Sequence, residues 1–255
     1  MAVFSHQRHH WAYVWVPYVG AFVWCGMLVA MITVYYARGG HPYPWQDSRT
    51  PYISDIGASF LQPLFIAGSS VTAASFVAVL VIERLLRHTG RLHADLRRRE
   101  KVFSYLAILG SVIGGLGLIL LSCFNDNSFD REHDSFLAVF IIGVALSAIF
   151  IIVEYRWLSH NCPDHQKLRV AYVIKGVIAG ILILLAIAYA ACFKTVTNVG
   201  AILEWIIAFG FTFYILSFAY DLRLSKGVHK FELSAVERLV PGDEPSSMRQ
   251  YRHGY

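Results

Sequence analysis

Six long apolar runs alternate with short polar segments along the chain. The runs cover residues 12–37, 64–82, 102–123, 136–153, 169–192 and 199–220. Each is close to the roughly 20 residues that an α-helix needs to cross a hydrocarbon core about 30 Å thick. Lipid cannot satisfy a backbone N–H or C=O, so each run is expected to be helical throughout. The pattern predicts an all-α, polytopic membrane protein built as a six-transmembrane-helix bundle.

Composition supports this fold class. The chain has 255 residues, of which 56% are hydrophobic and 15% charged, too apolar a mixture for a soluble domain of that length. The first ten residues lack the pattern of a cleaved signal, so the first apolar run is interpreted as an uncleaved span. We therefore expect a six-span membrane domain over residues 1–221 and a flexible cytoplasmic tail over residues 222–255.

Charge predicts the orientation of the bundle. Outside the spans, 17 Lys and Arg residues fall on one side and four on the other. By the positive-inside rule, both termini are cytoplasmic, and the loops around Tyr52, Asp130 and residues 193–198 face the outside or a lumen. The formal charge of +5 is then explained by topology, and we expect no nucleic acid partner.

Candidate functional groups gather on the predicted outer side. Ser54, Asp55 and Gly57 lie in a proline- and aromatic-rich first loop, and His133 and Asp134 lie in the second outer loop. Asp55 and Asp134 come just before helices that start at the outer side, where N-capping alone would favour an acceptor.

Glu204 extends this group, because it lies about a turn and a half inside the last span, where an ionisable residue indicates function. A contact between Glu204 and His133 is a hypothesis that the sequence leaves open. Lys175, in the fifth span, is interpreted as a residue whose ammonium group reaches the membrane surface.

The predicted inner side carries a basic cluster, Arg97, Arg98, Arg99 and Lys101, directly before the third span. Such a cluster binds anionic headgroups with about 1 kcal/mol per Lys or Arg near the surface. Enforcement of topology alone explains the same residues equally well.

Small residues spaced four apart favour close helix packing within the bundle. These pairs are Gly110 with Gly114, Gly143 with Ser147, and Gly176 with Gly180. A ligand groove is the alternative interpretation of the same pairs.

The sequence lacks the residues that most kinds of catalytic or metal site require. His41 and His133 are the imidazoles on the outer side, so a three-His metal site is excluded there, and a mixed His and Asp site is the remaining metal alternative. The chain has neither a Gly-rich phosphate loop nor a nucleophile elbow. We expect no metal and no cofactor. Cys123 and Cys192 end two spans on one side, where two free thiols are favoured over a disulfide.

The first outer loop resembles a known family. The segment Pro51-Tyr-Ile-Ser-Asp-Ile-Gly57 followed by Leu61-Gln-Pro-Leu-Phe-Ile66 is similar to the FRAG/DRAM/SFK family, most of all to its fungal members. The second loop, with His133-Asp134, also resembles the pattern of that family. The resemblance covers roughly residues 11–221.

This resemblance implies several roles. Members include a plasma-membrane protein linked to phosphatidylinositol 4-kinase signalling and lipid asymmetry, lysosomal autophagy modulators, and factors that remodel the lipid of GPI anchors. We expect a non-enzymatic membrane regulator or scaffold that engages anionic lipids or a peripheral kinase complex on the cytoplasmic side. The plasma membrane is the expected location, with endolysosomal and Golgi or ER membranes as the alternatives. The alternative is a lipid-remodelling enzyme of the outer face that uses Asp55, His133, Asp134 and Glu204.

Overall fold

The computed structural model describes residues 12–89, 98–161 and 166–224. The described residues form helices only. In chain order these are the 3-10 helix η1 (Ala12–Trp15) and the α-helices α1 (Val16–Ala37), α2 (Ile53–Gly57), α3 (Gln62–His88), α4 (Arg98–Cys123), α5 (Asp130–Asn161), α6 (Gln166–Cys192) and α7 (Thr197–Leu224).

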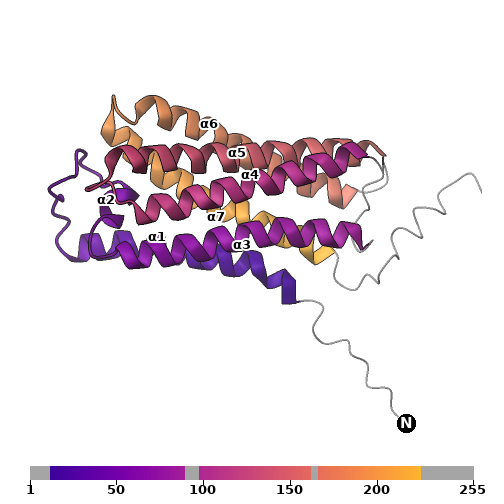
Figure 1. Cartoon of the computed structure of the whole chain (residues 1–255), viewed down its shortest axis with the longest axis horizontal. Helices are drawn as coiled ribbons and strands as arrows, with labels where there is room; N and C mark the ends of the chain where they lie inside the picture. The colour runs from indigo at the N-terminus through magenta and orange to yellow at the C-terminus, as the bar shows by residue number, and fades with distance from the viewer. Residues whose placement is uncertain (1–11, 90–97, 162–165, 225–255) are drawn as a thin grey trace, which may run out of the picture.

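The six long helices form a closed ring in which each contacts the next along the chain (Figure 1). α7 closes the ring by packing on α1, and α2 lies at one end, between α1, α3 and α7. We call this the α2 end; it also carries residues 38–61, 124–129 and 193–196. Among the described residues, six helices are long and apolar enough to cross a membrane, which confirms the predicted six-helix membrane fold.

Local sequence explains where the first helices begin and end. Pro17 and Pro63 lie in the first turns of α1 and α3, where a missing N–H costs no helical hydrogen bond. After α1, Gly39 and Gly40 adopt positive φ angles of 97° and 63°, which glycine reaches without steric cost. The chain therefore turns sharply into the first loop at this point.

Aromatic side chains fill much of the ring interior. Phe76 of α3 packs edge-on against Phe211 and Phe218 of α7, with ring centroids 5.6 and 6.0 Å apart. Between the neighbouring helices α1 and α7, the Trp24 indole N–H donates to the Ala208 carbonyl at 2.7 Å. These contacts fix α7 against α1 and α3 near the middle of the bundle.

Glycines lie in the contact of α4 with α5, which is the most extensive helix contact among the described residues. A Cβ atom on Gly143 would lie 2.5 Å from the Gly114 nitrogen, and one on Gly110 would lie 3.0 Å from the Gly143 carbonyl oxygen. The Ser147 hydroxyl donates to the Ala107 carbonyl across the same contact, at 2.8 Å. The packing prediction is confirmed for these residues.

The third small pair behaves differently. No heavy atom lies within 4 Å of a Cβ placed on Gly180, and the nearest atom to one on Gly176 is 4.0 Å away. The expectation that this pair packs closely inside the bundle is therefore wrong, because α6 runs at some distance from α5.

Helix boundaries change the setting of both polar segments. Asp130 to Asp134, expected in a loop, form the first turns of α5, and Ser54 and Asp55 form part of the separate helix α2. Five of the six long helices contain their predicted spans and extend beyond them, whereas the first predicted span, 12–37, is divided between η1 and α1. The predicted tail lies outside the described residues after Leu224, and the orientation in the membrane stays a prediction.

Candidate functional site

The short helix α2 is held in place by the first turns of α7. The Ile53 N–H donates to Glu204 Oε2 at 2.8 Å, and the Trp205 indole N–H donates to the Pro51 carbonyl at 2.9 Å. The Tyr52 hydroxyl donates to the Thr197 carbonyl at 2.8 Å. A segment near residue 53 and one near residue 200 are thereby joined at the α2 end.

Asp55 completes the start of α2. Its side chain is 2% exposed, and its Oδ2 accepts the Tyr52 N–H at 2.7 Å, as an N-terminal capping carboxylate does. Burial raises the pKa of Asp55 to about 7, the Tyr52 N–H bond opposes that rise, and the charge of Asp126 adds to it. The expected capping role is present, but it serves α2.

The surroundings of Tyr52, Gly57 and Ser54 show how the rest of this segment packs. Burial, followed by the charges of Glu204 and Asp55, raises the pKa of Tyr52 to about 12, so its hydroxyl remains a donor. A Cβ on Gly57 would lie 2.6 Å from a ring carbon of Phe65, so α2 can approach α3 only with glycine there. Ser54 is partly exposed on α2.

His133 and Asp134 have partners of their own. The His133 ring is 3% exposed, and its Nδ1 lies 2.7 Å from the Phe124 carbonyl oxygen, which assigns the ring proton to Nδ1. Asp134 pairs with the exposed Lys194 at 2.8 Å, and this pairing raises the pKa of Lys194. Among the described residues, Glu204 bonds to Ile53 and not to His133.

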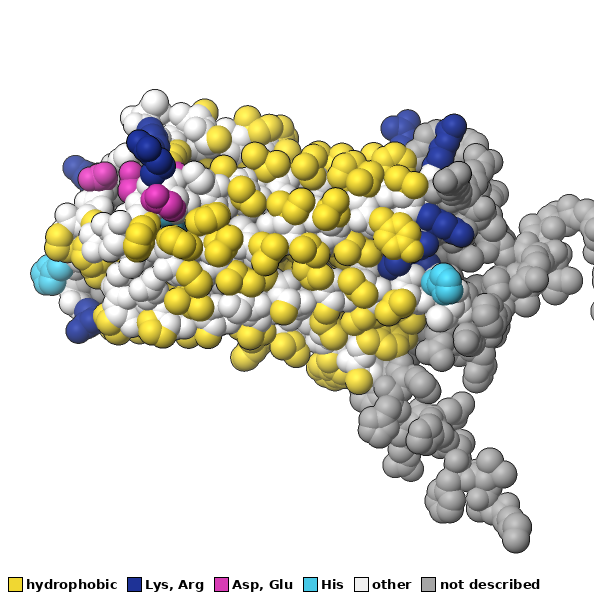
Figure 2. Space-filling view, viewed as in Figure 1, with side chains coloured by type: hydrophobic (Ala, Val, Ile, Leu, Met, Phe, Trp, Pro, Cys, Tyr) yellow, Lys and Arg dark blue, Asp and Glu magenta, His cyan; other side chains and the backbone are white. Residues whose placement is uncertain are grey.

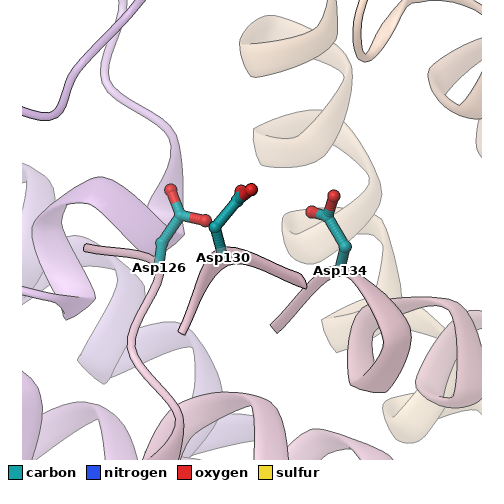
Figure 3. Close-up of side chains that lie close together, drawn as sticks. All are labelled: Asp126, Asp130 and Asp134. Atoms are coloured by element: carbon teal, nitrogen blue, oxygen red, sulfur yellow. The ribbon is translucent and has the colours of Figure 1, made fainter. Parts of the chain in front are cut away.

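Three carboxylates lie together near His133. Asp126, Asp130 and Asp134 each place one oxygen within 4.8 Å of the others (Figure 3). Burial is the main cause that raises the pKa of Asp126; the charge of His133 lowers it, and those of Asp130 and Asp134 raise it. Oxygen ligands of this kind suit a hard divalent cation, although Lys194 already neutralises part of the charge.

A family model describes this architecture. The model of the Frag1/DRAM/Sfk1/Cwh43P N-terminal domain matches residues 12–225, which is most of the chain. The protein belongs to this family. The match includes α2, the start of α5 and Glu204, and it confirms the resemblance seen in the first loop.

Individual relatives agree with this membership. "Protein sfk1" of Schizosaccharomyces pombe is 26% identical over 86% of this chain and 66% of its own length. "Protein SFK1" of Saccharomyces cerevisiae is 26% identical over 82% of this chain and 77% of its own length. The human "DNA damage-regulated autophagy modulator protein 1" is 23% identical over 72% of this chain and 80% of its own length. No solved structure matches the chain.

These matches make the chain a multi-pass membrane protein of a regulatory family. On the face shown in Figure 2, hydrophobic side chains predominate along the middle of the bundle, and charged side chains lie towards its two ends. The bundle thus presents an apolar belt between two polar ends, as a membrane protein requires.

The opposite end of this Frag1/DRAM/Sfk1 member carries part of the predicted basic cluster. Arg99 and Lys101 are exposed on the first turns of α4. Arg98 starts the helix but its side chain is not described, and Arg97 lies outside the described residues. The structure thus separates Arg99 and Lys101 from the α2 end by the length of the bundle.

Sequence reasoning missed a buried group of charges near that opposite end. Lys175 of α6, 1% exposed, forms an ion pair with Asp221 of α7, and its ammonium group lies 3.7 Å from the centroid of the Phe218 ring. The prediction that Lys175 reaches the membrane surface is wrong, because a buried carboxylate neutralises it.

Further polar groups connect the neighbouring helices to this pair. Arg87 donates to Glu83 one turn earlier in α3, at 2.8 Å, and lies 3.8 Å from Glu154 of α5. The Tyr155 hydroxyl of α5 donates to Glu83. Opposite charges in different spans were the signal that could have indicated this cluster.

A cavity that is open on one side lies mostly among α5, α6 and α7, and Trp24, Phe65 and Leu118 complete its wall. Its empty space is about 910 Å³ when the open solvent at its mouth is included. Its lining is apolar apart from Glu204 and the hydroxyl groups of Tyr189 and Tyr214. Of the four groups in the enzyme alternative, Glu204 lines this cavity, whereas Asp55, His133 and Asp134 do not.

Proposed function

We propose that this protein is a non-enzymatic membrane regulator that engages membrane lipids or a peripheral partner. One observation carries the proposal: the four candidate catalytic groups are engaged separately. Asp55 and Glu204 accept main-chain N–H groups of α2, His133 bonds to the Phe124 carbonyl, and Asp134 pairs with Lys194. A hydrolytic site needs such groups converging on one substrate atom.

The lipid or partner contact is proposed to involve the basic cluster. The exposure of Arg99 and Lys101 at the helix start supports contact with anionic headgroups, which attract such residues. A second group at the α2 end is also proposed to bind lipid or a partner; it comprises Ser54, Asp55, Gly57, His133, Asp134 and Glu204. The residues in the first loop resemble the SFK branch, and this supports a role in phosphatidylinositol 4-kinase signalling at the plasma membrane.

Neutralising the basic cluster tests this proposal. The variant Arg97→Gln/Arg98→Gln/Arg99→Gln should reduce membrane recruitment of the kinase complex and the amount of phosphatidylinositol 4-phosphate. Arg131→Gln, an exposed basic residue of the α2 end, is the control and should leave both unchanged. Unchanged recruitment in the triple variant would refute the proposal.

One observation favours the enzyme alternative, which is remodelling of GPI-anchor or other lipids at the outer face. Glu204 lines the cavity, so a lipid in that space reaches a carboxyl group. Mass spectrometry of lipids in cells with and without the protein separates the two functions. A missing lipid product, restored by the wild type and not by Glu204→Gln, would establish remodelling instead.

A further inference from the structure

We propose that the cavity between α5, α6 and α7 binds one neutral lipid whose polar end is an uncharged hydroxyl group, held by Glu204 and Tyr189. The lipid enters from the leaflet at the α2 end. This site is distinct from the basic cluster, and its existence does not depend on the regulatory function proposed above.

The cavity reaches the bilayer between α5 and α6. Towards the bundle centre it is closed by buried side chains, including Trp24, Phe211 and Tyr214. On α5 and α6 the lining residues Ala145 and Ile183 are partly exposed. These two helices contact each other least among the neighbours in the ring, so the opening lies at their contact.

The length of the cavity fits a molecule from one leaflet. Its lining runs along α6 from Ala179 to Tyr189 and along α7 from Glu204 to Tyr214. Ten residues of α-helix rise about 15 Å, which is half of a hydrocarbon core about 30 Å thick. The cavity therefore begins near the α2 end and stops near the bilayer middle.

Small residues leave the space open. Ala145 and Ala148 of α5 and Ala179 and Ala186 of α6 line the cavity, where larger side chains would fill it. A dry apolar cavity of this kind loses dispersion contacts with its lining and favours an apolar occupant. A lipid tail is the apolar group that the surrounding bilayer supplies.

Two polar groups near the α2 end define the head of this ligand. Glu204 Oε2 accepts the Ile53 N–H, whereas Oε1 has no partner within the described part of the chain. The Tyr189 hydroxyl is buried, on a side chain that is 3% exposed, and it too has no partner among the described residues. Leaving such a group unsatisfied in an apolar site is costly.

A hydroxyl satisfies both groups at once, because it can donate to the Glu204 carboxyl and accept from the Tyr189 hydroxyl. An ammonium group can donate to both side chains but leaves the Tyr189 O–H without an acceptor, and a phosphate would lie against a carboxyl group. Glu204 is the single acidic or basic residue among the lining residues, so no cation there would neutralise a phosphate. The site therefore selects an uncharged polar end.

Photo-crosslinking tests this site in the purified full-length protein in lipid nanodiscs. The probes are a photoreactive sterol, a photoreactive ceramide, a photoreactive phosphatidylcholine and a photoreactive long-chain amine. The sterol, the ceramide or both should label peptides of α5, α6 and α7, with the sterol and ceramide arms distinguishing the source of the hydroxyl. Equal or stronger labelling of these peptides by phosphatidylcholine or by the amine overturns the proposal.

A matched pair of variants separates the cavity from the outer lipid surface. Ala186→Phe fills the cavity and should reduce hydroxyl-lipid labelling about tenfold. Ala188→Phe, two residues further along α6 on an exposed position, should not change it. Equal labelling of the two variants, both eluting as folded protein in gel filtration, overturns the proposal.

The polar end is tested by two conservative changes. In a competition assay, unlabelled hydroxyl lipid displaces the photoreactive hydroxyl lipid from the site. Tyr189→Phe and Glu204→Gln should each weaken this competition about two- to tenfold, the usual range for one hydrogen bond. Binding of the phosphatidylcholine probe to the outer surface should stay unchanged in both. If both variants keep wild-type competition, the assignment of the hydroxyl site is wrong.

Discussion

Acidic side chains at the α2 end bond to main-chain groups. Asp55 accepts from Tyr52 in its own segment, and Glu204 accepts from Ile53, a residue 151 positions earlier. Each satisfies an N–H at the start of α2 that has no helical partner. The acids therefore stabilise a local structure at the α2 end, which explains their position without catalysis.

The raised pKa of Asp55 predicts a pH dependence of stability. Its pKa rises from 3.8 to about 7 in the folded protein, so between these values the folded state holds a proton that the unfolded state has lost. This contribution to the free energy of unfolding is full below pH 3.8 and falls as pH rises to about 7, by at most about 1.4 kcal/mol per pH unit.

The variant Asp55→Asn isolates this effect, because the amide oxygen still accepts the Tyr52 N–H but does not titrate. Thermal unfolding in detergent between pH 4 and pH 8 should show a wild-type melting temperature that falls relative to the variant as pH rises. A constant difference across this range would contradict the raised pKa.

The buried pair of Lys175 and Asp221 makes a second residue-level prediction. Lys175→Met leaves the Asp221 carboxylate buried without its cation, and this should lower the free energy of unfolding by about 3–5 kcal/mol. The double variant Lys175→Met/Asp221→Leu should recover most of the loss, because no unpaired charge remains.

The exposed pair of Lys194 and Asp134 is the control for that measurement. Lys194→Gln removes an ion pair in water and should not change the unfolding temperature measurably. A Lys175→Met protein as stable as the wild type would show that the buried pair does not contribute to stability.

At the scale of elements, the contact of α4 with α5 depends on glycines, which have no side chain to hold the helices apart. Gly143→Ala would place a Cβ 2.5 Å from the nitrogen and 2.6 Å from the Cα of Gly114, so the helix backbones must separate. We expect a loss of about 1–3 kcal/mol, as for other overpacked contacts. Thermal unfolding in detergent measures it.

Gly180→Ala is the matched change on α6, where the added Cβ meets no heavy atom within 4 Å. Because alanine has the higher helix propensity, stability should be unchanged or higher by up to about 1 kcal/mol. Equal unfolding temperatures for Gly143→Ala and Gly180→Ala would contradict the conclusion that Gly143 packs tightly against α4 whereas Gly180 contacts no other helix closely.

The sequence predicted the long helices well because lipid imposes length and apolarity on each of them. It could not predict which small residues meet another helix, since Gly114 and Gly180 look alike in sequence and differ only in what lies opposite. The same holds for Lys175, whose buried position depends on Asp221 in a different span. The packing of these glycines and the burial of Lys175 depend on contacts between distant parts of the chain, which the local sequence pattern does not contain.

The candidate site was predicted in part. The order of the spans indicated that Asp55 and Glu204 belong to one end of the bundle, and the structure joins both to α2. It did not indicate α2 itself, since a five-residue helix is too short for a periodic pattern. The cavity was also beyond prediction, because its walls come from helices throughout the chain.

At the scale of the whole molecule, charge predicts the orientation in the membrane. In a cysteine-free background, Ser128→Cys marks the α2 end and Arg99→Cys marks the opposite end, and both positions are exposed. For protein in the plasma membrane of intact cells, an impermeant maleimide should label Ser128→Cys and not Arg99→Cys, which should react only after that membrane is permeabilised. Labelling of Arg99→Cys in intact cells would refute the orientation.

The hydrogen bonds between α7 and the first loop have a consequence for the recognition of distant homologues. Two of its bonds end on the Ile53 N–H and the Pro51 carbonyl, which are peptide groups. Every amino acid supplies a backbone carbonyl, and every one except proline supplies a backbone N–H, so the residues of the loop can change while the docking persists. In distant homologues, the pair Glu204-Trp205 is therefore a better marker of this contact than the sequence of the loop to which it bonds.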